Sequence, residues 1–74
     1  MNEIAYKRLC KDLENIGSLD DTKQAKQEIN EMLFIYEKVV NSPLINLFKK
    51  KDQERMKELM QRARIIRFEI LMRE

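Results

Sequence analysis

The amino-acid sequence of 74 residues contains no histidine and no tryptophan, and only one cysteine, one glycine and one proline. Without histidine, the chain lacks the commonest metal ligand in proteins and the usual general base of an active site. The single cysteine, Cys10, has no second thiol in the chain with which to form a disulfide. We therefore expect no metal, no cofactor and no catalytic residue, and we do not expect an enzyme.

Long apolar runs are also absent. The longest uninterrupted runs cover only a few positions, whereas a membrane-spanning helix needs about 20 apolar residues. The first residues, Met1 to Ile4, lack the basic and apolar segments of a signal peptide. A lone thiol without an export signal is typical of the reducing cytosol. We therefore predict a cytoplasmic protein with no membrane partner.

What the sequence does contain is typical of a small helical domain. Charged residues make up 38% of the chain and hydrophobic residues 43%, which favours a folded chain over a disordered one. We expect a single domain over residues 1–74. One core of this size supplies only about 3–5 kcal/mol of stability, and small proteins usually add a disulfide, a metal or a second chain. Because the first two are not expected here, we predict a homo-oligomer and favour a dimer.

Helical periodicity, taken as about 100° per residue, predicts three helices, over about residues 2–16, 19–41 and 43–73. Gly17 suits the left-handed position that ends a helix, and the Ser18 hydroxyl is placed to cap the next one. The third helix begins at Ser42 and Pro43, because serine caps a helix and proline fits its first position. The polar stretch 49–53 is where this long helix would bend or split. The predicted fold is all-α, a hairpin of the second and third helices with the first packed across it.

Each predicted helix has one main apolar face, which we expect to form the core. In the first helix this face comprises Tyr6, Leu9, Cys10, Leu13 and Ile16. In the second it comprises Ala25, Ile29, Met32, Leu33, Tyr36, Val39 and Val40, with Ile35 at its margin. In the third, the face has heptad-like spacing and comprises Met56, Leu59, Ala63, Ile66 and Ile70, broadened by Met60 and Leu71. On this reading Cys10 is a small hydrophobic residue of the core rather than a nucleophile.

Four of the large apolar residues outside these faces are candidates for contact with another chain. Phe34 lies on the opposite side of its helix from the apolar face, while Ile65, Phe68 and Met72 form a second stripe on the last helix. A helix that is apolar on two sides is either sandwiched between elements or presents one side to another chain. With only two other helices to cover it, we expect the second stripe to contact another chain. Our first hypothesis is therefore a non-enzymatic interaction protein, acting as a regulator, inhibitor or adaptor.

Positive charge is concentrated in the C-terminal part of the chain. Residues 42–74 carry nine basic and five acidic side chains, whereas residues 1–41 carry six basic and eight acidic ones. The alternative hypothesis is a nucleic-acid-binding regulator. Its phosphate contacts would be Lys49, Lys50, Lys51, Arg55, Arg64 and Arg67. Acidic residues are interspersed among these positions and aromatic residues for base stacking are few, so we prefer the protein-binding hypothesis.

The run from Tyr36 to Phe48, YEKVVNSPLINLF, followed by Leu59 and Ile66, resembles the C-terminal half of the YlbF/YheA-type helical proteins. Those proteins also place a helix, a break of the Asn/Pro type, an aliphatic pair with an aromatic or aliphatic residue three positions on, and then a long helix. The resemblance covers about half of the chain. It implies a helical oligomer acting as a protein-binding accessory factor, of the kind associated with regulatory complexes in bacterial RNA processing and development. It implies no particular site residue.

Overall fold

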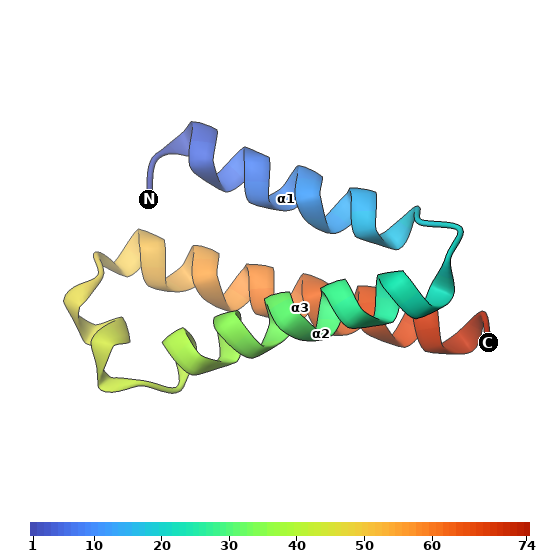
Figure 1. Cartoon of the computed structure of the whole chain (residues 1–74). Coiled ribbons are helices and arrows are strands. Elements are labelled where there is room, and N and C mark those ends of the chain that lie inside the picture. The colour runs from blue at the N-terminus through green and yellow to red at the C-terminus, as the bar shows by residue number, and fades with distance from the viewer.

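The computed structural model describes residues 1–74 and contains helices only, so the predicted all-α fold is confirmed. Its elements are α1 (Glu3–Gly17), α2 (Thr22–Val40), the short 3₁₀-helix η1 (Pro43–Leu47) and α3 (Lys50–Met72). The three α-helices run in alternating directions along an elongated molecule of 38 × 24 × 14 Å (Figure 1). The α2–α3 hairpin is the most extensive helix pair, and α1 packs on both of its members. None of the helices combines the length and the apolar character needed to cross a bilayer.

The core lies along the axis of this bundle and consists of residues from the predicted apolar faces. Its eleven buried members are Leu13, Ile16, Ala25, Ile29, Leu33, Tyr36, Met56, Leu59, Met60, Ala63 and Ile70. The other members of those faces are partly buried, and all but Leu71 are recorded as packing against this cluster. Burying a Leu, Ile or Met side chain contributes about 1.5–3 kcal/mol relative to leaving it in water. The periodicity of the sequence therefore identifies the core correctly.

The connection between α1 and α2 differs from its prediction. No residue of the chain has a positive φ, so Gly17 ends α1 in a right-handed conformation and the left-handed expectation is wrong. Ser18 does not cap α2 either, because its hydroxyl donates to the Glu14 carbonyl of the preceding helix (3.0 Å). Asp21 takes that role, accepting two first-turn N–H groups of α2 at 3.0 and 3.1 Å. A carboxylate is a stronger acceptor than a hydroxyl at a helix N-terminus, and residues 18–21 are needed to reverse the chain.

The helix predicted over residues 43–73 is not continuous, and it splits at the start of the polar stretch 49–53, where a bend or split was expected. Ser42 and Pro43 do begin a helical segment, but it is the short η1, and α3 starts only at Lys50. Between them, Phe48 and Lys49 are extended, with ψ of 149° and 151°. The break serves tertiary packing, since the short turn brings Ile45 onto the core and the extended residues redirect the chain along α2 (Figure 1).

Candidate interaction surface

The side of α3 that faces away from the bundle carries an uncovered apolar line. Ile65, Phe68 and Met72, called the outer stripe below, keep 57%, 63% and 70% of their surface exposed. Their spacing of three and then four residues places them on one face of the helix. The opposite face of the same helix holds Leu59 and Ala63, which are completely buried. The structure thus places all three residues where the sequence analysis expected them.

Polar contacts join the outer edges of α2 and α3. The Arg67 Nε group donates to Asn30 Oδ1 at 2.8 Å. One turn away, an Arg64 Nη group donates to Glu37 Oε1 at 3.3 Å. Exposed ion pairs contribute little stability, about 0–1 kcal/mol. These contacts matter here mainly because they show which residues of the two helices lie next to one another.

Phe34, the fourth predicted contact residue, lies on this same edge of α2. It is one turn from Asn30, just as Phe68 is one turn from Arg64 on α3. The two aromatic residues therefore belong to neighbouring helix edges. Phe34 is 65% exposed, and its ring is covered only in part by the Lys38 ammonium group, 5.8 Å from the ring centroid.

Sequence analysis missed one further exposed apolar residue on α2. Ile35 is 57% exposed, although its position had been taken as the margin of the apolar face. Together with Phe34 it lines a shallow surface groove whose other walls are Asn30 and Glu31. The run of five apolar residues from Met32 to Tyr36 is the signal that could have identified this groove, because five consecutive residues go all the way round a helix and cannot all face one core.

The predicted phosphate-binding residues fall into two groups. The arginines are engaged within the chain: Arg64 with Glu37, Arg67 with Asn30, and Arg55 with the Glu3 carboxylate. The three lysines, Lys49 to Lys51, take part in none of the chain's five ion pairs. The six residues therefore do not form one free basic surface.

Arg55 is the most firmly held of these arginines. Its guanidinium group stands 4.6 Å from the centroid of the Tyr6 ring and pairs with Glu3. The Arg55 hydrogen bond and charge hold the pKa of the Glu3 carboxyl below its usual range. The stacking and the ion pair together fasten the first turn of α1 to α3. We therefore assign Arg55 a structural role.

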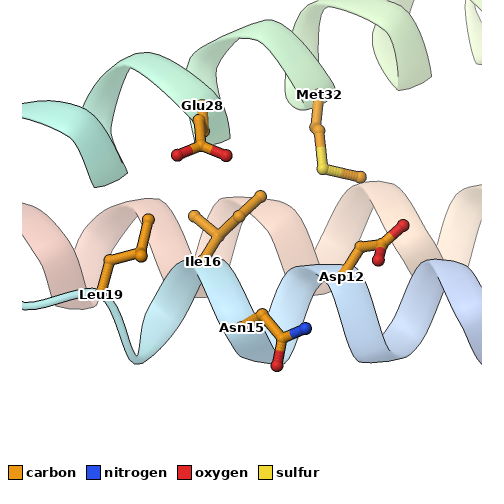
Figure 2. Close-up of a pocket in the computed structure, with 6 residues that line it drawn as sticks. All are labelled: Asp12, Asn15, Ile16, Leu19, Glu28 and Met32. Atoms are coloured by element: carbon orange, nitrogen blue, oxygen red, sulfur yellow. The ribbon is translucent and has the colours of Figure 1, made fainter.

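A cleft of about 360 Å³ lies between α1 and α2. Figure 2 shows Glu28 and Met32 reaching from α2 toward Ile16 and Leu19, while Asp12 stands at the rim. Asn15 lines the same cleft, but its side chain points away from α2. Glu28 Oε2 is buried and has no hydrogen-bond partner. Chemically, the cleft offers carboxylate acceptors over an apolar floor, without a nucleophile.

The cysteine and serine side chains elsewhere in the chain pack in the core or cap helices. The Cys10 thiol is partly buried among the apolar residues of α1. The Ser18 and Ser42 hydroxyls are used at helix ends. No group of three or more Cys, Asp or Glu side chains is placed to hold a metal ion. The remaining candidate sites are two parts of the protein surface. One is the outer stripe with Phe34, and the other is the end of the bundle around η1.

No family model, curated protein or solved structure matches the chain. The resemblance to YlbF/YheA-type proteins therefore stays a prediction.

Proposed function

We propose that this protein is a small, non-enzymatic interaction protein that self-associates through the outer stripe of α3 and acts as a regulator, inhibitor or adaptor. The observation that carries the proposal is the exposure of Ile65, Phe68 and Met72 along one line of α3. Isolated apolar residues are normal on protein surfaces, but a contiguous apolar patch marks an interaction site. Phe34, 65% exposed on the neighbouring helix edge, extends that patch.

The size of the patch suits a dimer of moderate affinity. In a two-fold dimer the same patch is used by both copies, so six side chains of the outer stripe are buried. With roughly 60% of each side chain exposed, the gain is about 1–2 kcal/mol per side chain. The total of about 6–12 kcal/mol is comparable with the about 4–15 kcal/mol that association costs. The contribution of Phe34 would favour the dimer further.

A small core gives a second reason for self-association. Only eleven of the 74 residues are buried, and a core of this size provides about 3–5 kcal/mol. The chain contains neither a disulfide nor a histidine with which to bind a metal. A second copy covering the outer stripe would add apolar burial that one copy cannot provide, because both of its other helices already pack on the inner face of α3.

The test is a triple variant with Ile65→Gln, Phe68→Gln and Met72→Gln, compared with the unchanged chain by sedimentation equilibrium. We expect the unchanged chain to be dimeric at micromolar to millimolar concentration and the triple variant to be monomeric over the same range. Glutamine is a good helix former, and all three positions are exposed, so helicity measured by circular dichroism should be unchanged.

Ile4→Gln is the matched control, because Ile4 is 75% exposed on α1 but lies outside the outer stripe. It should leave the dimer intact. A monomeric unchanged chain, or a triple variant that keeps the same oligomeric state and the same co-purifying proteins, would refute the proposal.

A further inference from the structure

The turn that connects α2 to α3 exposes apolar side chains at one end of the bundle. Leu44 and Leu47 are 60% and 80% exposed, and Leu47 is the most exposed large apolar residue of the chain. Both lie in η1, and a 3₁₀-helix has three residues per turn, so positions 44 and 47 project from the same side. Ile45 lies on another side and packs on the core. The turn is thus anchored by one side chain and displays two others.

Three consecutive lysines follow this turn after a single residue, Phe48. Lys49 is the residue before α3, and Lys50 and Lys51 are its first two residues. This is an unfavourable place for cations, because the N-terminus of a helix carries a partial positive charge. The Lys49 side chain makes no capping hydrogen bond there. The lysines therefore oppose the stability of α3. None takes part in an ion pair of the chain, and Asp52 is the one acidic residue in the same first turn.

The two features occupy the same end of the molecule, which we call the apolar–basic tip (Leu44, Leu47 and Lys49 to Lys51). Figure 1 places η1 and the start of α3 at the opposite end of the bundle from the α1–α2 connection. The tip offers no concave site, since none of the three surface pockets of the protein includes any of its residues. A peptide or small ligand is normally bound in a concave site, whereas a projecting apolar turn flanked by lysines can enter a fluid, negatively charged surface.

We propose that the apolar–basic tip docks the protein peripherally on an anionic lipid surface. Leu44 and Leu47 enter the interfacial region, while the lysines meet the phosphate and carboxylate groups of the lipid heads. The expectation of no membrane partner was based on the absence of a spanning run, and peripheral docking needs no such run. The proposal is independent of self-association, because the outer stripe lies on a different part of α3.

The number of lysines and leucines in the tip predicts how tightly the protein binds an anionic bilayer. Each lysine that reaches an anionic bilayer strengthens binding about fivefold, so three of them give about a hundredfold. Each leucine that leaves water contributes about a further tenfold. Neither set alone is expected to hold the protein on a membrane, since stable anchoring of peripheral proteins requires two signals.

The experiment is co-sedimentation with vesicles of phosphatidylcholine alone and of equal parts phosphatidylcholine and phosphatidylserine, at low and at physiological ionic strength. We expect the unchanged chain to bind the mixed vesicles, and to bind them more tightly at low salt. It should not bind the neutral vesicles. Leu44→Gln with Leu47→Gln should weaken binding about a hundredfold. Lys49→Gln with Lys50→Gln and Lys51→Gln should weaken it about a hundredfold.

Two controls match these variants. Ile35→Gln removes an apolar side chain that is exposed to nearly the same degree as Leu44, 57% against 60%, but is away from the tip. Substituting Gln for Lys11, Lys23 and Lys57 lowers the net charge by the same amount as the lysine variant, at exposed positions elsewhere. Both controls should retain most of the vesicle binding. So should the triple variant of the outer stripe, whether or not it dimerises.

Three outcomes would overturn the proposal. The first is equal binding, or no binding, to the two kinds of vesicle. The second is loss of binding in the lysine variant but not in the leucine variant, which would indicate adsorption by charge alone. The third is a chain that shifts duplex RNA or DNA through the same lysines and leaves the mixed vesicles unbound.

Discussion

The two faces of α3 carry similar residues but differ completely in their surroundings. On the inner face, Leu59 and Ala63 are completely buried and Ile70 is only 1% exposed, whereas on the outer face Phe68 and Met72 are 63% and 70% exposed. The cause is the number of helices, since α1 and α2 both pack on the inner side and nothing in the chain remains for the other. An apolar face thus shows that its burial would be favourable. It does not show whether the same chain or another chain packs on it.

The same contrast is found on α2. Tyr36 faces the core and is 4% exposed, while Phe34, two residues earlier, is 65% exposed. The buried aromatic residue has a cost, because its hydroxyl has no hydrogen-bond partner. On both helices, therefore, one face supports the fold and the other is exposed. The variants below test this division.

Leu59→Ala and Ile65→Ala compare the faces of α3 directly and should give the largest difference. Deleting the buried Leu59 side chain should cost about 2–5 kcal/mol, nearly the whole stability of a domain of this size, about 3–5 kcal/mol. Ile65→Ala should change the stability of the monomer by less than about 0.5 kcal/mol. Urea denaturation followed by circular dichroism at low protein concentration measures both. Equal losses would show that the outer face is buried within the folded chain.

Tyr36→Phe tests the inner face of α2. Removing a buried, unpaired hydroxyl should leave stability unchanged or raise it by about 1 kcal/mol. Burial raises the pKa of Tyr36 from 10.0 to about 12, so the folded state favours the neutral phenol. The resulting stability is complete below pH 10.0 and is lost as the pH rises toward about 12. The variant should lose less stability over this range than the unchanged chain.

Tyr6 is a second source of this alkaline loss of stability, and Tyr6→Phe tests it. The Glu58 carboxylate beside the Tyr6 hydroxyl, with a smaller effect of burial, raises the pKa of Tyr6 to about 12 as well. Each single variant should therefore remove part of the alkaline loss, and the double variant should remove more than either. A loss of more than about 1 kcal/mol on Tyr36→Phe at neutral pH would instead mean that the hydroxyl has a partner.

Gly17→Ala should change the stability least of these variants. It would add one apolar contact between the end of α1 and α3. Gly17 ends α1 without a positive φ, and a methyl group there would meet Ile66 Cγ2 at 3.5 Å, an ordinary contact. Alanine also restricts the unfolded chain more than glycine does, so we expect a gain of about 0.5–1 kcal/mol in thermal or urea denaturation. A loss of stability would indicate that the end of α1 takes a conformation reserved for glycine.

Prediction from the sequence worked best where local geometry decides the outcome. All eleven core residues belong to the predicted faces, and the four predicted contact residues are all exposed, because both follow from the angle between successive residues of a helix. It failed at the helix ends around Gly17 and Ser18, and it did not decide whether the helix from residue 43 is continuous. At those positions more than one side chain can cap a helix, and packing of the whole chain selects among them.

The candidate surfaces also depend on packing of the whole chain, which the sequence patterns do not show. The sequence indicated Arg55, Arg64 and Arg67 as free charges, but each meets a residue at least 27 positions away, Glu3, Glu37 or Asn30. The apolar–basic tip could not be predicted from the sequence for a related reason. In a continuous helix from residue 43, Leu44 and Leu47 would have been ordinary helical positions. The break at Phe48 and Lys49 is what makes them a projecting turn.

The sequence by itself determined that this chain forms helices, which residues make the core, and that α3 is apolar on two sides. These properties depend on residues within a few turns of one another. Only the tertiary structure decided which face of α3 is covered, which arginines are engaged and how the chain turns between α2 and α3. Those outcomes depend on contacts between distant segments, and with three helices only one face of α3 can be buried within a single chain.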